Sequence, residues 1–81
     1  MLISVTEQDI KDGVRAKCRA CPIALAIKRA TGNSDVSVGF NDFFIGEDMY
    51  FTTREMAEFI KAFDMGLFVQ PTRFQIGVKS E

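Results

Sequence analysis

The residues best suited to chemistry in this chain are two cysteines, Cys18 and Cys21, separated by two residues and followed directly by Pro22. Cysteine pairs at this spacing occur in thiol–disulfide redox sites and in metal sites. The start of a helix and the nearby cations Lys17 and Arg19 would favour a thiolate at Cys21. Redox sites of the thioredoxin type lie near a βαβ pattern, which this sequence lacks, so the spacing alone does not define a redox enzyme.

The cysteine pair also suits a metal ion, but a structural zinc site takes four cysteine or histidine ligands. The chain has two cysteines and no histidine. Two copies can pool Cys18 and Cys21 into a four-cysteine zinc site across a homodimer interface, and Asp12 is a further candidate ligand. A disulfide within the pair is disfavoured in a cytoplasmic protein. In the interpretation that we prefer, both cysteines pack as small hydrophobic residues and no cofactor is bound.

The element that must position the cysteine pair is a helix predicted over residues 22–31. Pro22 suits the first helical position because it has no N–H to leave unpaired. Lys28 and Arg29 fall in the last turn, where cations complement the helix dipole, and Gly32 can end the helix in a left-handed conformation. Residues 22–27 carry no charge. We therefore expect this helix to be buried on more than one side as the central core element.

The rest of the chain has the patterning of short strands and two more helices. Strands are predicted at residues 2–5, 36–40, 43–45, 49–52 and 72–79, with one further helix ending at Gly13 and another ending at Gly66. Thr6 with Asp9 forms a weak capping box before the first of these helices, and Thr52 with Glu55 forms one before the second. The apolar stretch 67–69 is expected to be an edge piece or connector. The eight phenylalanines are expected to lie in the core.

The element order β-α-α-β-β-β-α-β predicts one compact α+β domain spanning residues 1–81. Strands joined by hairpins favour a small antiparallel sheet of about four or five strands, with the helices packed on one face. No apolar run approaches the roughly 20 residues that span a bilayer, and the N-terminus lacks the pattern of a signal peptide. We therefore expect a cytoplasmic protein that does not associate with membranes.

Charge is distributed unevenly along the chain. Residues 1–30 hold six cations against three acids, a local charge of +3, while residues 31–65 hold seven acids against two cations, a local charge of −5. The six cations are the candidate partner-binding residues: Lys11, Arg15, Lys17, Arg19, Lys28 and Arg29. Such asymmetry favours oriented encounter with a charged partner. Clustered cations also engage phosphates, so a small nucleic-acid-binding protein is an alternative, although residues 11–19 lack aromatic residues for base stacking.

No other pattern in the sequence indicates an enzyme. Without histidine, acid–base catalysis would fall to carboxylates, and no isolated pair of carboxylates stands out on an apolar face. No two glycines are close enough to form a phosphate-binding loop. We therefore expect no catalytic residues and a protein that acts by stoichiometric binding, with a metal- or thiol-dependent module at Cys18 and Cys21 as the alternative.

One longer pattern resembles a known group of proteins. The run Cys18-x-x-Cys21-Pro22-Ile23-Ala24-Leu25-Ala26, preceded by Val5-Thr6-x-x-x-Ile10-x-x-Gly13, is similar to small bacteriophage proteins of unassigned function. The segments from Glu58-Phe59-Ile60 to Phe63-Asp64-x-Gly66 and Val69-x-Pro71-x-x-Phe74 resemble the same group. The resemblance implies an accessory protein that acts in the host bacterial cytoplasm and binds a host protein or nucleoprotein complex. It further suggests an inhibitor of host defence of the anti-CRISPR kind.

Overall fold

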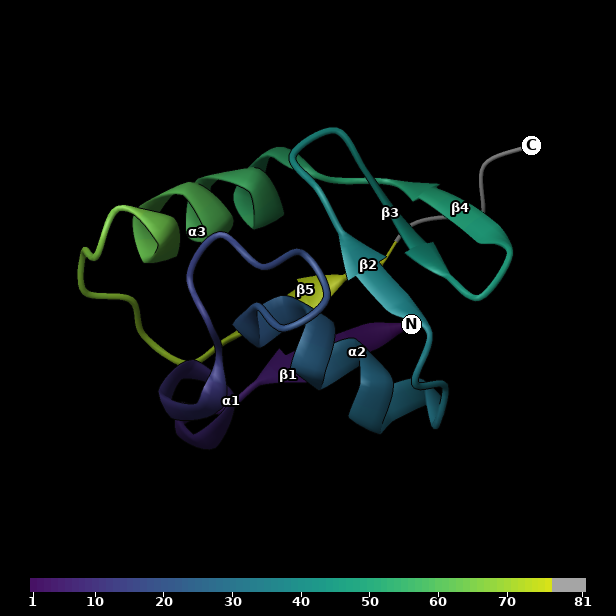
Figure 1. The fold of residues 1–81 in the computed structure, drawn as a ribbon, viewed down its shortest axis with the longest axis horizontal. Coiled ribbons are helices and arrows are strands. Elements are labelled where there is room, and N and C mark those ends of the chain that lie inside the picture. Colours follow the sequence, from purple (N-terminus) through teal and green to yellow (C-terminus); the bar gives the residue numbers. More distant parts are fainter. Residues whose placement is uncertain (77–81) are drawn as a thin grey trace.

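The computed structural model describes residues 1–76, which form three helices and five strands (Figure 1). In chain order these are β1 (Leu2–Val5), α1 (Glu7–Asp12), α2 (Pro22–Thr31), β2 (Val36–Val38), β3 (Asp42–Ile45), β4 (Asp48–Phe51), α3 (Arg54–Asp64) and β5 (Thr72–Gln75). The predicted α+β class and element order are confirmed. The last strand was predicted to reach residue 79, and residues 77–79 lie outside the described part.

The five strands divide between two antiparallel sheets, where the sequence suggested one. Hairpins join β2, β3 and β4, with Val38 opposite Phe43 and Phe43 opposite Tyr50. The other sheet pairs β1 with β5 and places Ile3 opposite Phe74. At the outer edge of β2, the N–H of Val38 donates to the carbonyl of Cys18 at 2.8 Å. The loop before α2 therefore occupies the edge where another strand would have to add.

Helix α2 forms as predicted, with its first residue at Pro22 and its last at Thr31. Cys21 is the N-cap, and Gly32 ends the helix in a left-handed conformation with φ 72°. Five residues of α2 are buried: Pro22, Ile23, Ala24, Ala26 and Ile27. They lie in one core with Ile3 and Val5 from β1. Within residues 1–76, no helix is both long and apolar enough to cross a membrane.

The N-cap of helix α3 lies one residue later than predicted. The hydroxyl of Thr53 accepts from the N–H of Met56 at 3.2 Å, so Thr53 is the N-cap. The hydroxyl of Thr52 instead donates to the carbonyl of Gly39 at 2.8 Å and holds the end of β4 to the β2–β3 turn. Two adjacent threonines offer equivalent caps in sequence, and this tertiary bond selects between them.

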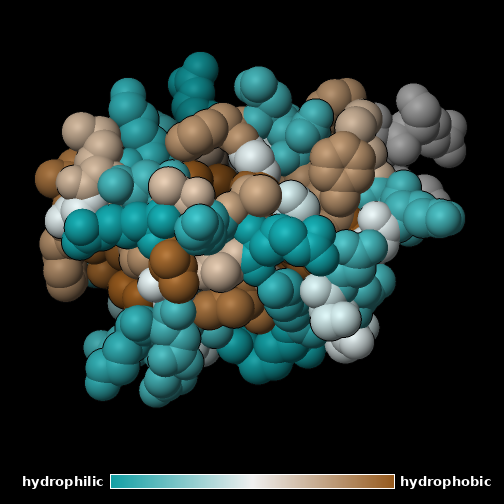
Figure 2. All heavy atoms as spheres, viewed as in Figure 1, coloured by the Kyte–Doolittle hydropathy of each residue, from teal (hydrophilic) through white to brown (hydrophobic). Residues whose placement is uncertain are grey.

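The expectation that the phenylalanines fill the core is wrong for half of them. Phe43 and Phe74 are buried, Phe59 and Phe63 are half-buried, and Phe40, Phe44, Phe51 and Phe68 are exposed. Successive strand residues point to opposite faces, so Phe43 packs on the core while its neighbour Phe44 faces outward. Figure 2 shows apolar side chains gathered on the surface over β3 and β4. Half of the phenylalanines are therefore available for contacts outside the chain.

Candidate functional site

Three of the six cations predicted to bind a partner form hydrogen bonds or ion pairs within the chain, namely Arg19, Lys28 and Arg29. The guanidinium of Arg29 pairs with both carboxylate oxygens of Asp9, at 2.6 Å and 2.9 Å, and also donates to the carbonyl of Ser4 at 2.8 Å. These bonds join α2 to α1 and β1. Arg29 therefore has a structural role, which the sequence did not indicate because its partner Asp9 belongs to another helix.

Asp9 is the one charged residue that is buried within residues 1–76. Its side chain also completes the capping box of α1 by accepting from the N–H of Thr6 at 2.9 Å. Burial alone would raise the pKa of Asp9, but the hydrogen bonds from Arg29 and Thr6 outweigh it, so the pKa is lowered. Asp9 is thus held as a carboxylate inside the fold.

Arg19 and Lys28 hold the loop that contains the cysteines. We call residues 13–21 the cysteine loop. The guanidinium of Arg19 pairs with Asp35 at 2.9 Å, and the ammonium of Lys28 donates to the carbonyl of Arg19 at 2.6 Å. One end of the cysteine loop is therefore fastened to α2 and to the residue just before β2.

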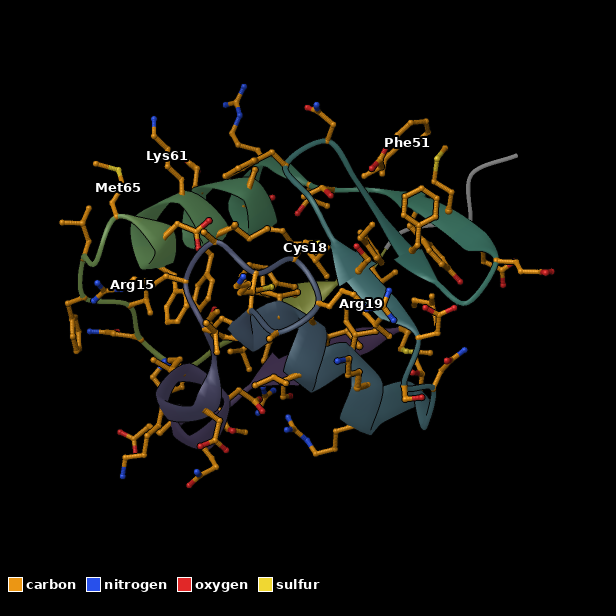
Figure 3. The ribbon with its side chains drawn as sticks, viewed as in Figure 1. Arg15, Cys18, Arg19, Phe51, Lys61 and Met65 are labelled. Carbon is orange, nitrogen blue, oxygen red and sulfur yellow. The ribbon has the colours of Figure 1, made fainter. Side chains whose placement is uncertain are left out.

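Arg15 lies farther toward the left of the view than Arg19, near the turn that follows α3 (Figure 3). Gly66 has φ 79°, and a Cβ atom at this position would lie 3.2 Å from the Arg15 guanidinium carbon. The guanidinium group therefore covers the Gly66 backbone. This contact joins the cysteine loop to the segment between α3 and β5.

The segment at residues 65–71, which we call the α3–β5 loop, carries three exposed large apolar side chains, including Phe68, the most exposed large apolar residue within residues 1–76. Phe68 is 84% exposed, Met65 is 65% exposed and Leu67 is 56% exposed. The start of the loop is fixed, because the N–H of Leu67 donates to the carbonyl of Ala62 at 2.9 Å. The sequence predicted an edge piece or a connector here. In residues 67–69 apolar and polar residues do not alternate as they would in a half-buried strand. This was the signal in the sequence for an exposed apolar loop.

An apolar groove of about 430 Å³ runs between α1 and the α3–β5 loop. Its apolar lining comes from Ile10, Phe68, Val69 and Pro71, and its polar lining comes from Glu7, Gln8 and Lys11. Two of the six predicted cations, Lys11 and Arg15, therefore lie beside exposed apolar groups. We call Lys11, Arg15, Leu67 and Phe68 together the apolar loop surface.

The two cysteines, together with Lys17, line a different hollow, which we call the cysteine cavity. It has a volume of about 310 Å³ and lies between the cysteine loop, the end of β2 and α3. Cys18 is exposed and Cys21 is buried, and both are free thiols. The Cys18 sulfur accepts from the Ser37 hydroxyl at 3.3 Å, and the Cys21 sulfur accepts from the N–H of Ala24 at 3.4 Å.

Burial raises the pKa of the Cys21 thiol, and the backbone hydrogen bonds at the start of α2 offset only part of this effect. Cys21 is 2% exposed, so its sulfur lies beneath the surface. A zinc site shared between two copies would need both thiols at the contact, and this burial disfavours it. Within residues 1–76, no group of three or more histidine, cysteine, aspartate or glutamate side chains is placed to hold a metal ion.

The structure defines a small α+β domain with an exposed apolar loop surface and a separate cysteine cavity. In comparisons with protein-family models, curated proteins and solved structures, the chain matches none of them. The function therefore has to be inferred from the residues of this chain.

Proposed function

We propose that this protein acts without catalysis, by binding one partner protein stoichiometrically through the apolar loop surface. The observation that carries the proposal is the 84% exposure of Phe68, which lines an apolar groove and follows the Gly66 backbone that the Arg15 guanidinium covers. Aromatic side chains are enriched among the anchor residues that dominate binding at protein interfaces.

The energetic argument rests on Leu67 and Phe68. Full burial of such a side chain contributes about 1.5 to 3 kcal/mol. Neither residue provides that contribution within the chain, because both are more than half exposed. A partner that covers both would therefore gain several kcal/mol of apolar burial. The fixed start of the α3–β5 loop reduces the entropy lost on binding.

The cations beside the α3–β5 loop indicate which charges the partner surface should carry. Arg15 is held against Gly66, and Lys11 lines the groove. The partner surface that would match is an apolar pocket bordered by carboxylates. The cations at the rim of the interface would attract these carboxylates and so steer the partner toward the α3–β5 loop. The resemblance to small phage proteins makes a bacterial host protein, or the protein part of a host defence nucleoprotein complex, the partner class to test first.

The test compares three forms of the full chain as affinity baits in lysate of a bacterial host. These forms are the wild type, Phe68→Ala and the matched control Phe51→Ala, which alters an exposed phenylalanine on β4. A protein that is retained by the wild type and the control but lost by Phe68→Ala is then purified. Its binding is measured by calorimetry, together with the mass of the complex in solution.

We expect a one-to-one complex, weakened at least tenfold by Phe68→Ala and left nearly unchanged by Phe51→Ala. Arg15→Glu should weaken it as well, most strongly at low salt. Equal binding by the wild type and Phe68→Ala would refute the assignment of this surface. Binding that requires nucleic acid and survives Phe68→Ala would support the nucleic-acid alternative instead.

A further inference from the structure

The cysteine cavity brings both thiols of the chain to one small hollow. We propose that this cavity binds one Cu(I) ion per chain through the thiolate sulfurs of Cys18 and Cys21. Figure 3 shows Cys18 where the cysteine loop passes between α2 and α3. This inference does not depend on the apolar loop surface, since Phe68 does not line the cysteine cavity.

The ligands available in the cavity fit a soft cation that takes two donors. Thiolates are soft ligands and select Cu(I), which readily forms linear complexes with two sulfurs. A structural zinc ion needs four ligands, and no suitable group of three or more is assembled within residues 1–76. The Asp64 carboxylate also lines the cavity, but it is a hard ligand and its Oδ1 accepts from the N–H of Ala16.

Hydrogen-bond donors of the fold contact both sulfurs. Each sulfur accepts one hydrogen bond, from the Ser37 hydroxyl to Cys18 and from the Ala24 N–H to Cys21. Such second-shell donors orient metal ligands and tune their affinity. A Cu(I) ion with two thiolates carries a single negative charge, and the cation Lys17 lines the same cavity.

The remainder of the lining is largely apolar. Val38, Phe40 and Ile60 contribute apolar side chains to the cavity. Binding breaks two S–H bonds and forms two Cu–S bonds, and both protons pass to the buffer. No electron is transferred, so the reaction needs no oxidant or reductant once the copper is supplied as Cu(I).

The experiment titrates the reduced full chain with Cu(I) under nitrogen, in the presence of the colorimetric Cu(I) chelator bathocuproine disulfonate. Native mass spectrometry gives the number of ions per chain. We expect one copper per chain in the wild type and complete loss to the chelator for Cys18→Ser and for Cys21→Ser. Serine can replace Cys21 as the N-cap of α2, so this variant should fold, which circular dichroism checks.

Two further samples test the cavity rather than the cysteines alone. Ser37→Ala should weaken Cu(I) retention about tenfold, because it removes the hydroxyl that donates to Cys18. A synthetic peptide covering residues 16–23 keeps both cysteines and should compete at least tenfold less well than the folded chain. Equal affinity of peptide and folded chain would refute a role for the cavity.

Other outcomes also decide the proposal. It is overturned if the chelator removes copper from the wild type as easily as from Cys18→Ser. It is also overturned if one copper or zinc ion is retained per two chains in a dimer, which would indicate a shared four-cysteine site. Unchanged Cu(I) retention by Phe68→Ala would support the independence of the two surfaces.

Discussion

The Asp64 carboxylate accepts a hydrogen bond from the backbone N–H of Ala16 at 2.9 Å, which joins the end of α3 to the cysteine loop. Ala16 adopts φ 58°, a left-handed conformation that an alanine takes only at a cost. Together with the contact of Arg15 on Gly66, this bond fixes the loop that separates the two candidate sites. The cysteine loop carries residues of both sites, so one strained residue and one carboxylate contribute to their position.

Ala16→Gly should stabilise the protein by about 1 kcal/mol, because glycine adopts positive φ without the steric cost of a Cβ atom. The free energy of unfolding in urea measures this effect. Ala30→Gly is the matched control, since Ala30 is also exposed but lies in the last turns of α2. That change should destabilise by about 0.5 to 1 kcal/mol. Destabilisation by both changes would contradict the left-handed conformation of Ala16.

Arg29→Ala should lower the free energy of unfolding by about 2 to 3 kcal/mol, because it leaves the buried Asp9 carboxylate without its main partner. Arg19→Ala removes an ion pair of similar length and serves as the control. The side chain of Asp9 is 6% exposed, whereas the side chain of Asp35 is 63% exposed. The control should therefore cost about 0.5 kcal/mol or less. Similar losses in urea unfolding would show that burial of the acid does not matter.

The lowered pKa of Asp9 predicts how stability depends on pH. A carboxylate whose folded pKa lies below its unfolded value contributes fully above the unfolded value, about 3.9. The contribution is lost as the pH falls through the folded pKa. The wild type should therefore lose more stability on acidification from about pH 5 to about pH 2 than Asp9→Asn does. Parallel curves of unfolding free energy against pH would contradict this linkage.

The two thiols should differ in reactivity. Cys18 is exposed, while Cys21 is buried and burial raises the pKa of its thiol. Iodoacetamide at neutral pH should therefore yield a singly alkylated chain, with the label on Cys18 by peptide mapping. Unfolding in urea should make both cysteines reactive, which controls for the reagent. Equal labelling rates in the folded protein would contradict the burial of Cys21.

The sequence was most informative where local chemistry fixes a boundary. Pro22 and Gly32 delimit α2 without help from other elements, and the α2 boundaries were predicted correctly. The position of the α3 cap was not predictable, because the bond from Thr52 to Gly39 comes from tertiary structure. The pairing of β1 with β5 could not be predicted either, because the alternation of apolar and polar residues indicates a strand but not the strand with which it pairs.

The candidate sites were less predictable than the fold. The cysteine pair is visible in the sequence, but its cavity depends on residues from β2 and α3 that only the fold brings near. Arg29 was predicted at a binding surface, and its ion pair with the buried Asp9 was not foreseen. Phe68 was treated as one of the core aromatic residues and is exposed. The inference that the phenylalanines lie in the core rests on residue type alone. It fails for Phe68 because its side chain lies on a short loop and is left exposed.

The antiparallel pairing of β1 with β5 sets the order in which the chain can fold during its synthesis. Leu2–Val5 leaves the ribosome early, but its strand partner Thr72–Gln75 is translated much later. The nascent chain can form α2 and the β2–β3–β4 hairpins locally, while Ile3 and Val5 lack their neighbours from β5. Completion of the core is therefore delayed until β5 emerges, and until then the apolar face of β1 is open to chaperones.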